Sequence, residues 1–174
     1  MDAHGRTDAA VLLPLYGWPE RAGLIFTERR ADLRRHPGEI SFPGGRQDDP
    51  GEDLRETALR ESEEEIGLAP ALVDLIGALP PIGTFVTSYK VHPFVGLVPQ
   101  DLHLEPSPAE VGAILRLGLD ELRAGYGMKR LIRRGVPIRT PTYTVGRHMI
   151  WGATARILGE FLERLPSGEA ADHG

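Results

Sequence analysis

The chain has 174 residues and a net charge of −5, with 41% hydrophobic and 26% charged side chains, which is typical of one globular domain with a sizeable core. The acidic balance argues against a generic nucleic-acid or anionic-membrane surface, which would need an excess of Lys and Arg. The absence of cysteine excludes disulfides, zinc–thiolate sites and cysteine nucleophiles. Residues 1–8 lack the apolar core of a signal peptide, and no apolar run approaches the roughly 20 residues that span a bilayer. We therefore expect a cytoplasmic protein.

The strands are predicted from short apolar runs between turn signals. We expect residues 9–165 to form one domain, with flexible segments at 1–8 and 166–174. Strands are predicted at 9–16, 23–27, 40–42, 73–79, 91–98 and 111–117. Irregular chain is predicted at 29–39 and 80–90, and Pro43, Gly44 and Gly45 should end the third strand.

Two helices stand out among these strands, and a third, short one is predicted at 119–123. Residues 53–66 contain neither Gly nor Pro and are rich in strong helix formers, and Gly67 stands where a helix C-cap glycine belongs. Residues 149–165 repeat apolar side chains every three or four positions, as in an amphipathic helix packed on a core. Strands mixed with helices predict an α/β domain with a mixed sheet.

The predicted helix 53–66 carries an unusual group of carboxylates. At 100° per residue, Glu61, Glu64 and Glu65 fall within an arc of about 100°, whereas Glu63 points elsewhere. The adjacent stripe, which we expect to be buried, consists of Ala58, Leu59, Ser62 and Ile66. A solvated acidic face is one interpretation, but like charges at these spacings and near a helix C-terminus destabilise the helix. A hard divalent cation such as Mg²⁺ or Mn²⁺ would remove both penalties, so the helix is a candidate metal site.

Gly44 and Gly45 lie shortly before this helix. Two adjacent glycines let the backbone turn sharply and approach a phosphate or a metal without interference from a Cβ atom. The carbonyl of Gly45 is therefore a candidate additional ligand. An ordinary turn after a strand is the alternative.

Residues 45–68 resemble the Nudix box, a pattern of Gly, Glu, Arg-Glu, two further glutamates and a final Gly. The matching residues are Gly45, Glu52, Arg60, Glu61, Glu64, Glu65, Gly67 and Leu68. The segment departs from the pattern by one additional residue between Gly45 and Glu52, and Ser62 stands where an aliphatic residue is usual.

A second block, residues 33–39 followed by Phe42, Pro43, Gly44 and Gly45, is similar to the coenzyme A pyrophosphatase branch of that family, which also tends to carry the additional residue. The resemblance implies an α/β/α sandwich that cleaves coenzyme A to 4′-phosphopantetheine and adenosine 3′,5′-bisphosphate, acting as a monomer or homodimer without nucleic-acid or membrane partners. Two alternatives stay open. One is hydrolysis of another nucleoside diphosphate derivative such as ADP-ribose, and the other is a non-catalytic Nudix-fold nucleotide sensor.

The resemblance also implies roles for particular residues. Glu61, Glu64 and Glu65, with the Gly45 carbonyl, would bind Mg²⁺ or Mn²⁺, and one of the glutamates would orient or deprotonate water. Arg60 would orient these ligands by pairing with Glu52 or Glu64, and Glu52 would either assist it or stabilise the helix N-terminus. An additional carboxylate is expected from a loop, and we favour Glu110 over Glu105. The remaining substrate-binding candidates are Arg29, Arg34 and His36 for the 3′-phosphate, and Gly44 and Gly45 for the diphosphate.

Overall fold

A computed structural model describes residues 7–33, 38–84, 88–133 and 135–166 of the chain. The elements follow in the order β1 (Thr7–Tyr16), β2 (Gly23–Arg29), β3 (Ile40–Ser41), β4 (Gly44–Arg46), α1 (Leu54–Ile66), the 3-10 turn η1 (Pro70–Leu72), β5 (Asp74–Ala78), β6 (Ile82–Gly83), β7 (Tyr89–Leu97), β8 (Val111–Gly118), α2 (Leu119–Ala124), β9 (Tyr126–Arg133), β10 (Val136–Val145), β11 (His148–Ile150) and α3 (Gly152–Glu163).

Most strands join one mixed sheet. Its order is β3-β2-β1-β7-β5, with β8 paired to β2, β4 to β1 and β6 to β7. Strands β1 and β7 run parallel and the other pairs are antiparallel. Strands β1 and β2 pair only at one end, where Leu15 and Tyr16 face Leu24 and Gly23. Beyond that point β3 continues along β2 and β4 continues along β1, so the short segment between β3 and β4 passes from one strand to the other.

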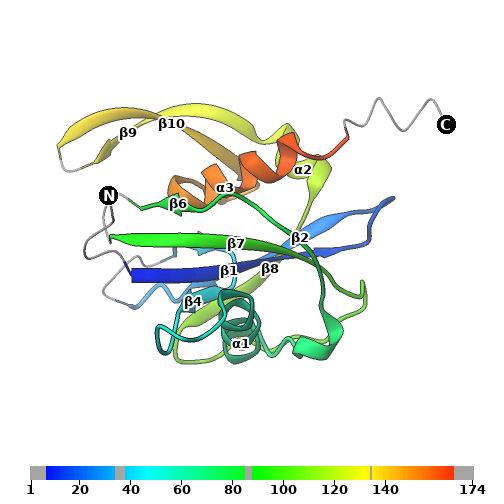
Figure 1. Ribbon diagram of the computed structural model, residues 1–174. Helices are drawn as coiled ribbons and strands as arrows, with labels where there is room; N and C mark the ends of the chain where they lie inside the picture. The colour runs from blue at the N-terminus through cyan, green and yellow to red at the C-terminus, as the bar shows by residue number, and fades with distance from the viewer. Residues whose placement is uncertain (1–6, 34–37, 85–87, 134, 167–174) are drawn as a thin grey trace.

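The sheet buries both of its faces. Successive side chains of a strand point to opposite faces, so Leu13 and Leu15 join one core and Ala10 and Leu12 join the other. Helix α1 covers the second core with Ala58 and Ile66, and α3 covers the first with Ala155, Ile157, Leu158 and Phe161. Figure 1 shows α1 on one side of the sheet and α3 on the other. The predicted α/β/α sandwich with a mixed sheet is confirmed.

Helix α1 forms as its sequence predicts. The Asp53 side chain caps it by accepting a hydrogen bond from the backbone N–H of Arg55, and Gly67 ends it in the left-handed conformation at φ 69°. Ala58, Ser62 and Ile66 are buried, while Glu63 and Glu64 are exposed. Ser62 tolerates burial because its hydroxyl donates to the carbonyl of Ala58 at 2.7 Å.

The structure corrects the prediction in several places. Strands β9, β10 and β11 form a second, three-stranded sheet that the sequence did not indicate. The last helix begins at Gly152 rather than at 149, because residues 148–150 form β11 and pair with β10. Gly44 and Gly45 do not simply end a strand, since they pair with β1 as part of β4. Strand β6 interrupts the predicted irregular segment 80–90.

The ends of the chain are described only in part. Strand β1 begins at Thr7, inside the segment 1–8 that we expected to be flexible. Of the predicted tail 166–174, only residue 166 belongs to the described residues. No helix in the described part of the chain is long and apolar enough to cross a membrane.

Candidate active site

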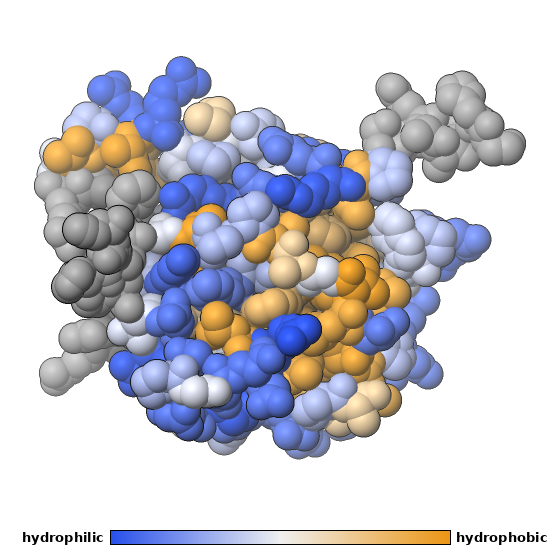
Figure 2. Space-filling view, viewed as in Figure 1, coloured by the Kyte–Doolittle hydropathy of each residue, from blue (hydrophilic) through white to orange (hydrophobic). Residues whose placement is uncertain are grey.

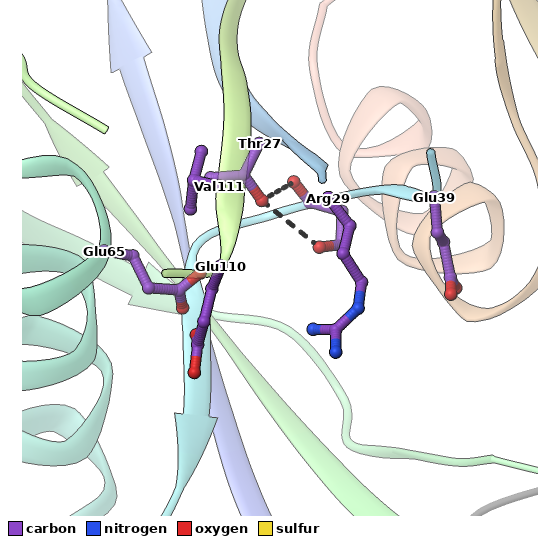
Figure 3. Close-up of a pocket in the computed structure, with 7 residues that line it drawn as sticks. Thr27, Arg29, Glu39, Glu65, Glu110 and Val111 are labelled. Carbon is purple, nitrogen blue, oxygen red and sulfur yellow. Dashed lines mark hydrogen bonds between the residues drawn. The ribbon is translucent and has the colours of Figure 1, made fainter. Parts of the chain in front are cut away.

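Four carboxylates from two parts of the chain converge beside the split between β1 and β2. Glu61, Glu64 and Glu65 come from the last two turns of α1, and Glu110 immediately precedes β8. The Glu65 Oε1 atom accepts a hydrogen bond of 2.9 Å from the backbone N–H of Gly44. Figure 3 shows the side chains of Glu65 and Glu110 next to each other. The carboxylate-bearing edge of α1 therefore faces β4 and the start of β8.

Burial and mutual repulsion raise the pKa values of two of these carboxylates, Glu61 and Glu65. The pKa of Glu65 is raised from 4.5 to about 7, first by burial and then by the nearby charges of Glu61, Glu110 and Glu64. The hydrogen bond from Gly44 opposes this rise. Burial also raises the pKa of Glu61, and the pairing of Glu61 with Arg60 opposes that rise. A cation bound among these carboxylates would relieve both the repulsion and the desolvation.

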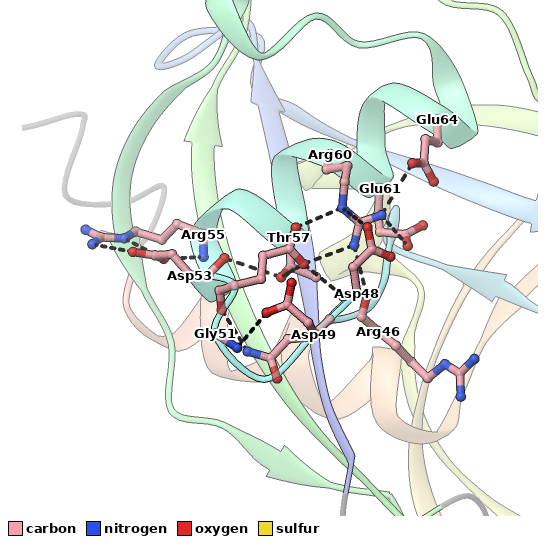
Figure 4. A network of polar contacts seen from close by, with 12 residues as sticks. Arg46, Asp48, Asp49, Gly51, Asp53, Arg55, Thr57, Arg60, Glu61 and Glu64 are labelled. Atoms are coloured by element: carbon pink, nitrogen blue, oxygen red, sulfur yellow. Dashed lines mark hydrogen bonds and ion pairs between the residues drawn. The ribbon is translucent and has the colours of Figure 1, made fainter.

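Arg60 connects two of the four converging glutamates to the loop that precedes α1. Its Nε and Nη2 atoms donate to the two carboxylate oxygens of Glu52 at 2.9 and 3.1 Å. Its Nη1 atom donates to Glu61 at 3.0 Å and to Glu64 at 3.3 Å. Both predicted partners of Arg60, Glu52 and Glu64, are therefore in contact with it. Figure 4 shows the contacts that Arg60 makes with Glu64 and with Glu61.

Glu52 is held from three sides. Besides Arg60, the hydroxyl of Thr57 donates to its Oε1 at 2.7 Å, and the backbone N–H of Asp48 donates at 3.1 Å. These bonds, with Arg60 the largest contributor, lower the pKa of Glu52 to about 2. Glu52 therefore stays ionised at any ordinary pH and fixes the position of Arg60.

The two glycines of β4 allow a close approach of the backbone to its neighbours. A Cβ atom on Gly44 would lie 2.2 Å from the carbonyl oxygen of Ala10, and one on Gly45 would lie 2.6 Å from the carboxyl carbon of Glu61. The contact at Gly44 is with backbone and excludes any side chain there, whereas a side chain at position 45 would displace the carboxylate of Glu61. The glycines thus bring the β4 backbone against the carboxylate edge of α1.

A cavity of about 190 Å³ opens on the same side of the split. Its lining consists of Thr27, Arg29, Glu39, Ser41, Glu65, Glu110 and Val111. Figure 3 shows the guanidinium of Arg29 between Glu110 and Glu39. One cavity therefore combines the buried carboxylate, the loop carboxylate and a cation that can contact phosphate oxygens.

A second cavity of about 300 Å³ lies between the sheet and α3. Gly44, Gly45 and Arg46 line it together with apolar side chains that include Phe42, Val91 and Ile157. Ser41 lines both cavities, so the segment from β3 to β4 separates a polar compartment from an apolar one.

The structure brings most of the predicted site residues together. Glu110 lines the cavity with Glu65, whereas the side chain of Glu105 is 80% exposed and contacts His103. Arg34 and His36 lie outside the described residues. Sequence reasoning missed Thr27, Glu39 and Ser41. Thr27 and Ser41 had no local signal, because they become neighbours only through the pairing of β2 with β3. For Glu39 the available signal was its position directly before the predicted strand at 40–42.

The donors at this site fit a hard divalent cation. Carboxylate and carbonyl oxygens are the ligands that Mg²⁺ and Mn²⁺ prefer. Several carboxylates lie close together here, and the raised pKa values of Glu61 and Glu65 indicate that their negative charges are unfavourable without a cation. In the conformation observed, no three Asp, Glu or His side chains among the described residues are arranged around one ion position. Arg60 instead contacts the Oε1 atoms of Glu61 and Glu64, so it competes with a metal for one oxygen of each carboxylate.

A family model, the NUDIX domain, matches residues 6–134 of the chain. The chain therefore belongs to the Nudix hydrolase family, whose members hydrolyse nucleoside diphosphate derivatives and generally use divalent cations such as Mg²⁺ or Mn²⁺. Among its relatives is an uncharacterised Nudix hydrolase, NudL, of Enterobacter sp. strain 638, which is 40% identical over 161 residues, or 91% of this chain and 83% of the relative. NudL of Cronobacter sakazakii is 43% identical over 154 residues, covering 87% and 79% of the two chains.

Solved structures share the fold at low sequence identity. A MutT/nudix family protein from Enterococcus faecalis superposes with a TM-score of 0.64 at 12% identity, over 91% of this chain and 61% of that one. The NUDIX domain of Shewanella oneidensis NrtR, solved with ADP ribose, gives a TM-score of 0.59 at 12% identity, over 93% and 90%.

Proposed function

We propose that this protein is a metal-dependent diphosphatase that cleaves coenzyme A to 4′-phosphopantetheine and adenosine 3′,5′-bisphosphate, with thioesters of coenzyme A as further candidate substrates. The observation that carries the proposal is one cavity in which Glu65 and Glu110 face Arg29, beside a glycine backbone that admits a phosphate. The arginine suits the negative charge of a diphosphate, and the two glutamates suit the cation that accompanies it.

The metal would be Mg²⁺ or Mn²⁺, held by Glu61, Glu64 and Glu65 with the carbonyl of Gly45. When bound, such a cation neutralises diphosphate charge, polarises the P–O bond and lowers the pKa of a bound water. Burial of Glu65 strengthens its interaction with any cation, because less water screens the charge.

The protein's own residues would then position the reaction. Water attacks one phosphorus, the P–O–P bond breaks, and the other phosphate leaves as a monoester, while the proton of the water passes to a carboxylate of the site. Glu110 is our candidate for that carboxylate because it lies beside Glu65 in the cavity. Arg29 would neutralise phosphate oxygens from the opposite wall.

The choice of coenzyme A rests on the block at residues 33–45. Its described part includes Glu39 and Ser41, which line the cavity with Arg29. Arginine and histidine are suited to a phosphomonoester dianion, so Arg34 and His36 of this block remain our candidates for the 3′-phosphate. A nucleoside diphosphate derivative without that phosphate would not need them.

A comparison of substrates tests the proposal. Steady-state rates should be measured for coenzyme A, ADP-ribose, NADH and diadenosine polyphosphates, each with Mg²⁺ and with Mn²⁺. We expect the highest kcat/KM for coenzyme A. Much faster cleavage of ADP-ribose would overturn the substrate assignment, and binding of nucleotides without cleavage of any of them would indicate a sensor instead of an enzyme.

The Glu52–Arg60 pair gives a prediction about metal affinity. In Glu52→Gln, Arg60 loses the carboxylate that it contacts with two nitrogen atoms and should compete more strongly with the metal for Glu61 and Glu64. We expect the metal concentration that gives half-maximal rate to rise about 10- to 100-fold, measured by titration of activity with Mg²⁺. The control is Glu56→Gln, which neutralises an exposed glutamate in the first turn of the same helix. An unchanged metal requirement in Glu52→Gln would contradict this role of Arg60.

A further inference from the structure

One segment of this acidic protein carries basic side chains without any acidic ones. Residues 122–159 contain eight Lys or Arg residues and no Asp or Glu, so all 25 acidic residues lie elsewhere. Four of them lie in the strands of the β9–β10 hairpin, namely Lys129, Arg130, Arg133 and Arg139. The net charge of −5 is therefore the sum of a basic segment and a more strongly acidic remainder of the chain.

Among the described residues, the same hairpin carries five of the eight exposed large apolar side chains. Its members are Tyr126, Met128, Ile132, Val136 and Ile138, and near the turn Ile132 is 75% and Val136 58% exposed. Among the described residues, the other exposed large hydrophobic side chains are Trp18, Leu72 and Ile76. Figure 2 shows apolar atoms at the end of this hairpin bordered by hydrophilic ones.

These apolar side chains lie on both faces of the hairpin. Ile132 is opposite Pro137, and Ile138 is opposite Leu131, so strand alternation puts Met128 and Ile132 on one face and Val136 and Ile138 on the other. A folded partner that covers a flat surface contacts one face of a hairpin. A lipid interface surrounds an inserted end and contacts both faces.

Two described charges of the hairpin, Arg130 and Arg139, lie next to each other. Arg130 and Arg139 are direct cross-strand neighbours on the same face, an arrangement that destabilises a sheet. Within the described ranges neither is paired with a carboxylate. An external anionic surface would neutralise them, whereas two copies of this hairpin placed face to face would repel each other.

We propose that the β9–β10 hairpin docks this protein on an anionic lipid surface. Ile132 and Val136 would enter the boundary between headgroups and acyl chains, and the Lys and Arg side chains would extend to lipid phosphates. Figure 1 shows the hairpin on the far side of α3 from the sheet and from α1, so the acidic edge of α1 lies away from such a surface. This inference does not depend on the substrate or on the proposed activity.

Sedimentation with lipid vesicles tests the proposal. The full chain is mixed with vesicles of phosphatidylcholine alone and with vesicles of an equal mixture of phosphatidylcholine and phosphatidylglycerol. We expect binding to the mixed vesicles only, weakened by added salt. The double variants Ile132→Ser/Val136→Ser and Arg130→Glu/Arg139→Glu should each weaken partitioning at least about tenfold. Ile76→Ser, which changes a comparably exposed isoleucine on β5, should bind like the wild type.

Several results would overturn it. They are absence of binding to the mixed vesicles, equal binding to both vesicle types, and hairpin variants that bind like the wild type. If the wild type instead forms a dimer in analytical ultracentrifugation that Arg130→Glu/Arg139→Glu dissociates, and vesicles are not bound, the hairpin is an interface between copies of the chain. Retention on heparin without vesicle binding would indicate another polyanion. Unchanged unfolding midpoints of the variants show that any loss of binding is not a loss of fold.

Discussion

Replacing Glu65 by glutamine should lower kcat by at least about 100-fold. The amide keeps the size of the side chain, and its oxygen can still accept the hydrogen bond from Gly44. It loses the negative charge that a divalent cation needs at the most buried carboxylate of the site. The measurement is steady-state cleavage of coenzyme A over a range of Mg²⁺ and Mn²⁺ concentrations.

Glu63→Gln is the matched control. Glu63 lies on the same helix but is exposed, and at 100° per residue it points away from Glu61 and Glu65. This variant removes one negative charge from the same helix and should keep wild-type turnover. Normal turnover in Glu65→Gln would remove the basis for a metal site on α1. A loss of similar size in both variants would mean that the overall charge of the helix matters more than the position of one ligand.

The helix that carries the site could be predicted almost to the residue. Its signals are local: the capping side chain of Asp53, a run without Gly or Pro, and Gly67 in the left-handed conformation. Burial of Ala58 and Ile66 follows from the 3.6-residue period alone, and so does the separation of Glu63 from Glu65.

The second sheet could not be predicted, for a physical reason. A strand is recognised when one face is buried and apolar residues alternate with polar ones. Strands β9 and β10 are exposed on both faces over much of their length, and β10 contains Pro137 and Pro141. Without a buried face there is no alternation, and proline argues against a strand. The sequence places residues 149 and 150 of β11 in the following helix, because the apolar side chain of Ile150 fits the helical period by chance.

The site itself was predictable only in part. The carboxylates of α1 are close in sequence, so helical geometry brings them together. The approach of Glu110 to Glu65 depends on β8 pairing with β2, and that of Gly45 to Glu61 depends on β4 pairing with β1. Such long-range pairings leave no periodic signal in the sequence. The residues that they bring to the cavity, including Thr27 and Ser41, could therefore not be recognised from their local sequence.

In the metal-free protein, the free energy of unfolding should fall as pH rises from about 5 to about 8, by up to about 3 kcal/mol. The pKa of Glu65 is raised in the folded state from 4.5 to about 7, so folding is favoured while Glu65 is protonated in both states. The contribution is complete below pH 4.5 and is lost as pH passes through 7. The raised pKa of Glu61 acts in the same direction. Glu52, whose pKa is lowered to about 2, affects stability only at more acidic pH.

Denaturant unfolding in EDTA at a series of pH values measures this slope. Glu65→Gln should flatten it and should be more stable than the wild type at pH about 8, whereas Glu63→Gln should keep the wild-type slope. Adding Mg²⁺ or Mn²⁺ should restore stability to the wild type at alkaline pH, by about 2.7 kcal/mol at a hundredfold excess over Kd, and should do little for Glu65→Gln. A wild-type protein that gains stability with rising pH in EDTA would contradict the burial of Glu65. If the metal stabilised both proteins equally, the cation would bind outside this group of carboxylates. We therefore expect the same carboxylate to destabilise the fold without a cation and to hold the cation at the proposed site, which would account for the convergence of three glutamates of α1 with Glu110.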